Sequence, residues 1–325
     1  MSTLNNLKKY VARVVYYGPE YVLDSINFLT GRNRAWPSVK KKEANYKKLS
    51  EQAYIDEMTK WFYMRTGEKL ELDNPITFNQ KLQWLKIYDK NPLKTLLADK
   101  YLVREWVKER IGESYLIPLI GVWDKAEDID FETLPQSFVL KCNHGSGWNI
   151  IVRNKAKLDI RKTVEQLTKW MTMNYAYEAR FELHYKDIIP KIIAEKYIEN
   201  NNDEIYDYKC YCFNGHLYFI QFISDRKHGI KMAYFDRDWR LQQFVNNHPQ
   251  IDFTVPKPDN LDKLIYLAET LSQGFPFVRV DFYRLNNGDL KFGEITFTPT
   301  SGTQDWRPPS ANEMLGALLI LPEKY

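Results

Sequence analysis

The sequence has few cysteines and no long hydrophobic run. Its three cysteines, Cys142, Cys210 and Cys212, cannot form a disulfide framework, and no CxxC pair or His/Cys cluster has the spacing of a zinc site. No run of about 18 apolar residues is present, so no membrane-spanning helix is expected. Internal repeats are also missing, which excludes repeat architectures. Cys210 and Cys212 lie two residues apart, and we expect them to share one face of a strand as small hydrophobic residues.

Positive charge is concentrated in the first 50 residues. The chain has a formal net charge of +4. Residues 1–50 hold ten Lys and Arg against Glu20, Asp24 and Glu43, a local charge of about +7. Such a segment either binds an anionic membrane surface peripherally or forms a solvated leader helix, and both alternatives stay open. Arg13 interrupts the apolar part, so no signal peptide is expected. The cytoplasm, or the inner face of the membrane, is the expected location.

Length and composition predict a globular protein with more than one structural unit. The 325 residues are 44% hydrophobic and 27% charged. At about 150 residues per domain, a chain of this length forms roughly two or three units. Helical patterns come first and strands later, which is typical of the α+β class. We expect a basic helical segment over 1–50, a helical region over 51–133, a subdomain with a glycine-rich loop over 134–193, and a C-terminal subdomain over 194–325.

Helices are expected at four places before residue 190. The first covers 51–66, where four apolar side chains share one face: Tyr54, Met58, Trp61 and Phe62. Thr77 starts a second helix with Gln80 three residues on, as a capping box. A third over 93–110 carries Asp99 and Lys100, and a fourth covers 161–186.

Strands dominate the C-terminal part. They are expected over 192–198, 206–213 and 217–223, with Asn214-Gly215 as a two-residue hairpin turn. A helix over 260–271 precedes two further strands over 277–283 and 290–297. Ser310 and Glu313 indicate the cap of a last helix.

The last hairpin predicts a metal site. If Asn287-Gly288 is a two-residue turn, Asp281 lies opposite Glu294 and Arg279 lies opposite Thr296, all on one face. Two opposed carboxylates repel each other unless a cation lies between them, and Mg²⁺ takes one or two carboxylates together with substrate phosphates. The alternative is an exposed hairpin with scattered charges. The register is assumed, because a slip of one residue would break the pairing.

The stretch FVLKCNHGSGWNIIV places Lys141 at the end of an apolar strand before a glycine-rich loop. One interpretation is an ordinary hairpin with a solvated lysine. The other is a phosphate site, because glycine N–H groups and a lysine both bind phosphate oxygens. The strand end AEKYI could offer backbone groups to an adenine, and Asp207 a carboxylate to a ribose hydroxyl; Lys209 shares the face of Asp207.

The order of these motifs resembles the ATP-grasp superfamily: DKYLVREW, FVLKCNHGSG, AEKYI with DYKCYCFNG, and FVRVDFY with FGEITF. More narrowly, NPITFNQKLQWLKIYDKNP with LADKYLVREWV looks like the TupA-like ATP-grasp family of bacterial surface-polysaccharide gene clusters. The resemblance covers roughly residues 50–310. It implies an α+β fold in which two subdomains clamp ATP, with 134–193 as the lid subdomain, preceded by a helical N-terminal region.

The resemblance also implies roles for individual residues. ATP phosphates would contact Lys100, Lys141 and the lid loop His144, Gly145, Ser146 and Gly147. The nucleoside would contact Glu195, Tyr197, Ile198 and Asp207, with Lys209 beside it. Mg²⁺ would be held by Asp281, Glu294 and Thr296, and Arg279 together with Lys141 would act in catalysis. Thr296 departs from the E-x-N pattern of many ATP-grasp ligases, which leaves the second metal position in doubt.

The implied activity is an ADP-forming carboxylate–amine ligase that uses ATP and Mg²⁺. Its substrates would be a saccharide or lipid-linked saccharide and an amino acid, giving an amide decoration of a surface polysaccharide; no nucleic-acid partner is expected. A sugar kinase and an inactive nucleotide-binding partner of a glycosyltransferase complex stay open. Candidates for holding the acceptor are His144, Trp148, Arg226, Lys227 and the segment Thr298–Trp306.

Overall fold

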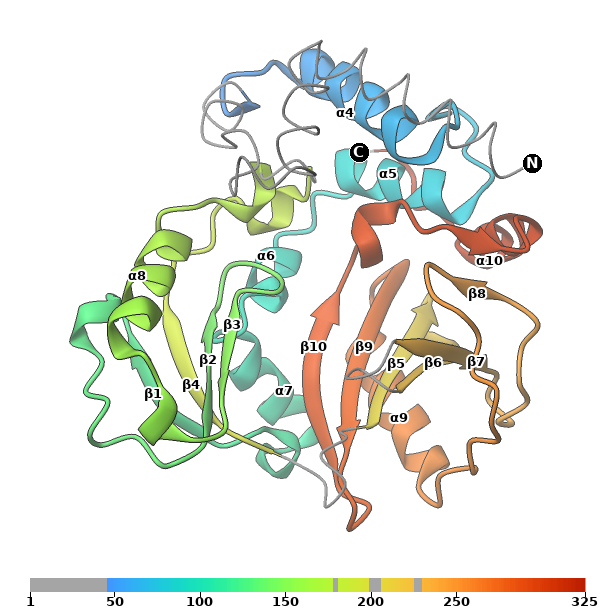
Figure 1. The fold of residues 1–325 in the computed structure, drawn as a ribbon. Coiled ribbons are helices and arrows are strands. Elements are labelled where there is room, and N and C mark those ends of the chain that lie inside the picture. The colour runs from blue at the N-terminus through green and yellow to red at the C-terminus, as the bar shows by residue number, and fades with distance from the viewer. Residues whose placement is uncertain (1–45, 178–180, 199–205, 225–229, 325) are drawn as a thin grey trace, which may run out of the picture.

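The computed structural model describes residues 46–324 apart from 178–180, 199–205 and 225–229. Two antiparallel sheets lie side by side below a group of helices (Figure 1). The predictions for Arg226, Lys227 and most of the basic segment 1–50 fall outside the described residues. Within the described part of the chain, no helix is both long and apolar enough to cross a membrane.

The first helix has the predicted bounds, and the second begins where the sequence predicts. Helix α4 covers Glu51–Thr66, and the hydroxyl of Ser50 accepts a hydrogen bond from the N–H of Ala53 at its start. Its four expected apolar residues are buried. Helix α5 covers Phe78–Tyr88 and has the predicted capping box of Thr77 and Gln80. Both predictions are confirmed.

The single helix expected over 93–110 is wrong. It is divided into α6 (Leu93–Ala98) and α7 (Val103–Ile111). Asp99 causes the break, because its Oδ1 accepts hydrogen bonds from the N–H groups of Tyr101 at 2.7 Å and Leu102 at 3.1 Å. An aspartate that binds nearby backbone N–H groups favours a helix start over a helix interior. Lys100 therefore lies in the break between two helices.

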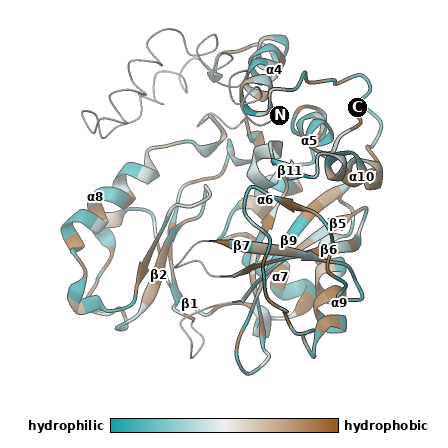
Figure 2. Ribbon diagram, turned by 45° about the vertical axis from the view of Figure 1, so that its right-hand side comes forward, coloured by the Kyte–Doolittle hydropathy of each residue, from teal (hydrophilic) through white to brown (hydrophobic). Residues whose placement is uncertain are grey.

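The smaller sheet has four antiparallel strands in the order β1-β4-β2-β3. The strands are β1 (Leu119–Trp123), β2 (Phe138–Cys142), β3 (Asn149–Val152) and β4 (Ile192–Lys196). Helix α8 (Ile160–Met171), which Figure 2 colours as largely hydrophilic, contributes Leu167 to the apolar core on one face of this sheet. Strand β1 lies before the subdomain boundary expected at 134, and β4 extends past the one expected at 193. The sheet therefore crosses both expected boundaries.

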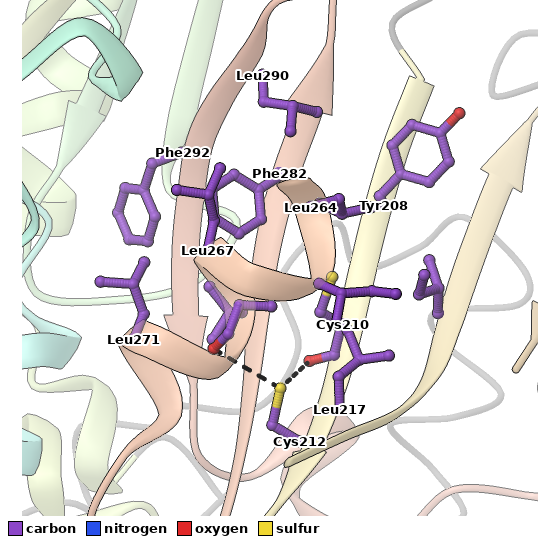
Figure 3. Packing of buried hydrophobic residues seen from close by; sticks show 14 of the residues in the cluster. Tyr208, Cys210, Cys212, Leu217, Leu264, Leu267, Leu271, Phe282, Leu290 and Phe292 are labelled. Carbon is purple, nitrogen blue, oxygen red and sulfur yellow. Dashed lines mark hydrogen bonds between the residues drawn. The ribbon is translucent and has the colours of Figure 1, made fainter. Parts of the chain in front are cut away.

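The larger sheet has five antiparallel strands in the order β10-β9-β5-β6-β7. They are β5 (Tyr206–Phe213), β6 (His216–Ser224), β7 (Lys231–Phe235), β9 (Phe277–Arg284) and β10 (Leu290–Thr296). Helix α9 (Leu261–Ser272) packs on one face, where Cys210 and Cys212 are fully buried as expected (Figure 3). The thiol of Cys212 donates weakly to the carbonyls of Cys210 and Ala268.

Helix α5 and helix α10 (Ser310–Leu318) cover one end of the opposite face of the large sheet. Phe78 and Leu82 of α5 pack there against Tyr211, Phe213 and Phe277. The expected cap at Ser310 is wrong, because Pro309 occupies the cap position without a side-chain hydrogen bond. A two-stranded sheet of β8 (Val245–Asn246) and β11 (Trp306–Arg307) lies beside these helices.

Short 3-10 turns connect several of these elements. The helix expected over 161–186 ends at Met171, and the described residues after it form two such turns, at Tyr175–Tyr177 and Leu183–Tyr185. Other turns lie at Glu113–Tyr115, Ala126–Asp128, Lys155–Lys157 and Pro299–Gly302. The last of these directly follows β10.

The two predicted hairpin turns have different outcomes. Asn214 and Gly215 have φ angles of 50° and 80° and join β5 to β6 as a two-residue turn, as expected. Between β9 and β10 the loop is one residue longer than the predicted two-residue turn. The hydrogen bond from the N–H of Leu285 to the carbonyl of Asp289 closes this longer loop. A bulge at Gly293 then compensates for the extra loop residue. A Cβ on Gly293 would lie 3.1 Å from the carbonyl oxygen of Asp281, so this close approach favours glycine.

Candidate functional site

A row of polar side chains crosses all five strands of the large sheet on the face opposite α9. Glu294 pairs with Asp281, Asp281 with Lys209, Lys209 with Gln221, and Gln221 with Tyr234. Side chains of directly paired residues lie on the same face, so these five are neighbours. The row is continuous from one edge of the sheet to the other.

The predicted pairing of Asp281 with Glu294 and of Arg279 with Thr296 is confirmed. It holds although the predicted turn is wrong, because the longer loop and the bulge at Gly293 each shift the register by one residue in opposite senses. The four site residues lie beyond the bulge and keep the expected partners. A sequence pattern alone does not predict the bulge.

Two cations hold the carboxylate of Asp281. Arg279 donates from Nε to Oδ1 and from Nη2 to Oδ2, both at 2.7 Å, and Nζ of Lys209 lies 2.5 Å from Oδ2. The same Nη2 of Arg279 lies 3.1 Å from Oε1 of Glu294 and 3.0 Å from Oγ1 of Thr296. The oxygens of Asp281, Glu294 and Thr296 therefore converge on one positively charged nitrogen.

This set of oxygens fits a hard cation such as Mg²⁺. Two carboxylates and a hydroxyl are oxygen ligands only, and Mg²⁺ accepts so few protein ligands when phosphates and water complete its shell. The described residues contain no group of three or more His, Cys, Asp and Glu that could form an all-protein cage. The ligand role of Asp281, Glu294 and Thr296 stays a prediction.

Glu294 remains charged over the whole physiological range. Burial alone would raise its pKa, but the positive charges of Lys100, Arg279 and Lys209 outweigh burial and lower the pKa to about 2. Lys100 comes from the break between α6 and α7, so its charge reaches Glu294 from another part of the chain. The two halves of the candidate site are thus electrostatically coupled.

A second charge cluster lies on the small sheet. Lys141 of β2 and Glu195 of β4 point from the face opposite the α8 core, with Nζ 2.6 Å from Oε2. Arg104 of α7 donates to Oε1 of the same glutamate at 2.8 Å and to the carbonyl of Ile117 at 2.8 Å. Glu195 is 6% exposed. A buried carboxylate is stable here because both of its oxygens bind cations.

A cavity of about 570 Å³ borders this cluster. It lies between α7 and the chain that enters β1, and Arg104 is in its wall. Its size is within the range of small-molecule sites, roughly 300–1,000 Å³. The other lining residues are Tyr101, Leu102, Glu105, Lys108, Glu113 and Leu116–Leu119.

Lys100 connects the helix break to the glycine-rich loop. Its ammonium donates to the carbonyl of Gly145, and its backbone N–H donates to the carbonyl of Asn143 at 3.2 Å. Burial, together with the nearby charge of Lys141, lowers the pKa of Lys100. The structure therefore brings together Lys100, Lys141 and the loop, as the resemblance implied.

The glycine-rich loop is anchored at one end by aromatic packing. A Cβ on Gly145 would lie 2.5 Å from the indole of Trp148, so only glycine fits there. Ser146 and Gly147 are exposed, and Gly147 has a φ of 76°. His144 is buried, with Nδ1 3.2 Å from Oδ1 of Asn143 and Nε2 3.2 Å from the carbonyl of Trp170. The backbone of the loop is available to a ligand, whereas the imidazole faces the core.

The nucleoside candidates are only partly described. Tyr197 and Ile198 are half-buried just after β4, where the hydroxyl of Tyr197 accepts a hydrogen bond from Nε of Arg153 at 2.9 Å. The polar loop expected after them lies outside the described residues from 199 to 205. Asp207 is buried on β5, with Oδ2 3.2 Å from Nζ of Lys209. Their roles in binding a nucleotide stay predictions.

Two of the acceptor candidates, Trp148 and Trp306, pack among aromatic side chains, and their contact with an acceptor stays a prediction. Trp148 is 8% exposed and packs edge-on against Tyr175. Trp306 is 4% exposed and packs against Tyr234 and Phe244. Both indoles are core residues, and the buried imidazole of His144 packs against Trp148. Of the described acceptor candidates, Thr300 lies exposed in the turn that follows β10.

Sequence reasoning missed three residues of the two clusters. Arg104 stands inside the quoted block DKYLVREW, but nothing in the block predicts a contact with Glu195, which lies 91 positions away. Gln221 and Tyr234 complete the row on the large sheet. Gln221 does not follow from the confirmed turn at Asn214-Gly215, because the pairing set by that turn places Ile220 opposite Lys209. A bulge between Tyr211 and Cys212 shifts the pairing by one residue and brings Gln221 there instead.

Two α+β subdomains with a lysine-rich cluster on one sheet and opposed carboxylates on the other define an ATP-grasp protein. The model of the TupA-like ATP-grasp family matches residues 80–320. The chain therefore belongs to the TupA-like ATP-grasp family, and its fold is the α+β ATP-grasp fold preceded by helices. The family resemblance stated from the sequence is confirmed.

Solved structures show several similar chains at low identity. D-alanine–D-alanine ligase from Bacillus anthracis is 19% identical over 62% of this chain and 57% of that chain, with a TM-score of 0.39. N5-carboxyaminoimidazole synthetase from Staphylococcus aureus is 16% identical over 62% and 44%, with a TM-score of 0.36. The ATP-grasp ligase PsnB, in a complex with Mg and ADP, is 9% identical over 63% and 52%, with a TM-score of 0.36. The matches thus span about half of those chains. Among curated proteins, none matches this chain.

Proposed function

We propose that this protein is an ATP-dependent ligase that activates a carboxylate as an acyl phosphate and joins it to an amine. The observation that carries the proposal is the convergence of Asp281 and Glu294 on Nη2 of Arg279, next to Lys209. MgATP requires carboxylates that bind the metal ion and, next to them, positively charged side chains that bind the phosphates. Membership of an ATP-grasp family supports the same reading.

The small sheet would bind the nucleotide phosphates. Lys100 and Lys141 supply point charges, and the exposed backbone of Ser146 and Gly147 supplies N–H groups. The nucleoside would contact Glu195, Tyr197, Ile198 and Asp207. Because Lys141 and Arg104 already pair with Glu195, the carboxylate has a fixed direction before any ligand binds.

The large sheet would hold the metal and the reacting phosphoryl group. When bound, Mg²⁺ would neutralise phosphate charge at Asp281, Glu294 and Thr296. Arg279 lies within hydrogen-bond distance of all three, so its guanidinium is placed to stabilise negative charge on the transferred group. Lys209 pairs with Asp281, and its ammonium group would stabilise the negative charge of the phosphoryl group during transfer.

The chemistry would proceed in two displacements. A carboxylate oxygen of the acid attacks the γ-phosphorus of ATP, and ADP leaves. The amine then attacks the acyl carbon, phosphate leaves, and the amine loses a proton. Phosphoryl transfer depends mainly on positioning and charge neutralisation, which the two clusters supply without a covalent intermediate on the protein.

The substrates we propose are a sugar uronate, free or lipid-linked, and an amino acid, which would give an amide decoration of a bacterial surface polysaccharide. The turn after β10 would contact the acceptor, because it begins three residues after Thr296 and exposes Thr300. The basic residues 1–50 would hold the enzyme at the cytoplasmic membrane surface, where lipid-linked saccharides are found.

Trapping with hydroxylamine tests the reaction class. The protein is incubated with MgATP and a panel of uronic acids and amino acids, with and without hydroxylamine, and ADP and hydroxamate are measured. Hydroxamate with stoichiometric ADP supports the acyl phosphate. A stable phosphorylated sugar without hydroxamate would instead identify a kinase. ATP binding without ADP release for any acceptor would identify an inactive nucleotide-binding partner. The threonine at position 296, where many ATP-grasp ligases have asparagine, is the feature that favours this alternative.

A further inference from the structure

The turn that follows β10 has an unusual backbone. Thr300 and Ser301 have φ angles of 52° and 55°, and Gly302 has a φ of 71°. For a residue other than glycine the left-handed region is sterically unfavourable, so two such residues in succession are strained. Strain of this kind persists only where the surrounding structure determines the conformation. The turn begins three residues after Thr296.

Side chains on one face of α5 fix this turn. Nε2 of Gln83 donates to the carbonyls of Ser301 at 3.0 Å and Gly302 at 2.8 Å. Nζ of Lys86 donates to the carbonyl of Ser301 at 2.6 Å and to Oε1 of Gln83 at 3.1 Å. Both side chains are buried. Because residues 83 and 86 are one helical turn apart, they reach the same segment.

Asn79, one helical turn earlier, fixes the far end of the same segment. Its Nδ2 donates to the carbonyl of Gln304 at 2.8 Å, and its Oδ1 accepts from the N–H of Gln304 at 3.3 Å. The side-chain amide of Gln304 in turn donates from Nε2 to the hydroxyl of Tyr211 at 3.1 Å. Tyr211 lies directly opposite Arg279 in the sheet. A chain of contacts therefore joins α5 to the strand pair that carries the candidate site.

The fit between helix and turn is close. A Cβ on Gly302 would lie 2.4 Å from Nε2 of Gln83 and 3.0 Å from Cβ of Leu82. Lys86 also lies 4.8 Å above the ring of Trp61 from α4. A buried lysine and two buried amides are expensive to desolvate, and apolar residues of similar size would fill the same space at less cost. The presence of these three buried polar side chains is explained if they are needed to fix the conformation of the turn.

We propose that Asn79, Gln83 and Lys86 are positioning residues for the acceptor substrate. They hold residues 300–302 in the left-handed conformation, so that the exposed edge at Thr300 faces the acid or amine at the end of β10. The inference rests on the proposed function for the identity of the acceptor. It assigns a role to the helix α5, which has no other part in the proposed chemistry.

Variants of three side chains on α5 test the proposal. Lys86→Met and Gln83→Leu remove the contacts with the turn. Lys81→Met is the matched control, because Nζ of Lys81 also binds two backbone carbonyls at 2.8 Å, those of Gly316 and Leu319 in and after α10. Hydrogen–deuterium exchange of the amides of Ser301 and Thr303, which bond to Thr298 and Thr300, reports the turn.

We expect Lys86→Met to speed exchange of these amides about tenfold and to lower kcat/KM for the acceptor about tenfold, with the affinity for ATP unchanged. Lys81→Met should change neither. Adding Ser301→Gly to Lys86→Met should recover much of the lost kcat/KM, because glycine enters the left-handed region without a steric cost. A purely structural role would not be rescued in this way.

Two results would overturn the proposal. Equal exchange rates in Lys86→Met and Lys81→Met would show that α5 does not hold the turn. Faster exchange with unchanged kcat/KM would show that the turn is held but does not serve the acceptor. If no acid–amine pair releases ADP with the unaltered protein, the proposed function fails, and the exchange rates alone then decide whether α5 holds the turn.

Discussion

The charge clusters on the two sheets have opposite balances. The small-sheet cluster has three cations, Lys100, Lys141 and Arg104, around the single carboxylate of Glu195. The large-sheet cluster has two cations among three carboxylates: Lys209 and Arg279 with Asp207, Asp281 and Glu294. An excess of positive charge suits phosphates, and an excess of carboxylates suits a metal cation. The difference supports the proposal that the anionic part of MgATP binds at the small sheet and the metal at the large sheet.

The clusters also differ in how the chain assembles them. On the large sheet, Asp281, Glu294, Arg279 and Thr296 belong to one hairpin, and strand register brings them together. On the small sheet, Lys100 and Arg104 come from a helix break and a helix, whereas Glu195 lies on β4. One site is local in sequence and the other depends on the packing of distant segments.

Asp281→Asn should have the largest effect. The neutral amide leaves Arg279 and Lys209 without their shared carboxylate and removes a metal ligand, and breaking a buried pair costs about 3–5 kcal/mol. We expect ADP release to fall at least about a hundredfold and the melting temperature to fall. Activity is measured below the melting temperature of the variant.

Asp289→Asn, in the exposed loop of the same hairpin, is the control and should be neutral. Turnover of Asp281→Asn at the unaltered rate would remove the large sheet from the proposed chemistry.

Arg104→Met tests the small sheet in the same way, with a smaller expected effect. Glu195 keeps Lys141 but loses the hydrogen bond from Arg104, which is worth about 1.5–3 kcal/mol for a charged group. We expect a corresponding loss in urea unfolding and about tenfold weaker binding of a fluorescent ATP analogue.

Arg110→Met removes an exposed arginine of the same helix that stacks on Trp106, and it serves as the control. If both variants bind the analogue equally, Arg104 does not position Glu195 for the nucleotide.

The difference between local and distant assembly explains what the sequence could predict. The opposed pairs of the last hairpin followed from alternation and pairing, even though the loop length was wrong and the bulge at Gly293 was unforeseen. Lys141 and the glycine-rich loop were singled out by their spacing. The break at Asp99 was missed because helical periodicity continues through it, and a single hydrogen-bonding side chain decides the outcome. Arg104 could not be assigned, because its partner depends on tertiary packing.

Acid should destabilise the protein through His144 before it acts through Glu294. Burial lowers the pKa of His144, beside the glycine-rich loop, to about 4. Below its ordinary value of 6.5, an unfolded chain binds a proton that the folded chain rejects, so stability falls as the pH decreases from 6.5 to 4. The slope is about 1.4 kcal/mol per pH unit for one histidine. The low pKa of Glu294 contributes stability above pH 4.5 that is lost only as the pH falls towards 2.

Urea unfolding at pH 7, 6 and 5 measures this slope. His144→Gln should flatten it, whereas His216→Gln should not, because the side chain of His216 is 72% exposed. The buried His184, whose pKa burial lowers to about 3, remains in both variants and adds the same slope to each. An identical pH dependence in the two variants would contradict the assignment to His144.

Thr296→Asn should have the smallest effect and concerns the large sheet alone. The E-x-N pattern expected from many ATP-grasp ligases places an amide carbonyl where this chain has a hydroxyl, and Thr296 here donates to Oε1 of Glu294 at 3.0 Å. A carbonyl oxygen is a better Mg²⁺ ligand than a hydroxyl, so we expect the Mg²⁺ concentration for half-maximal ADP release to fall by about threefold, with the affinity for ATP on the small sheet unchanged. Thr298→Asn, two residues further, tests whether any asparagine near the strand end has this effect, and it should not. A higher Mg²⁺ requirement in Thr296→Asn would mean that the hydroxyl serves Glu294 and Arg279 and does not bind the metal.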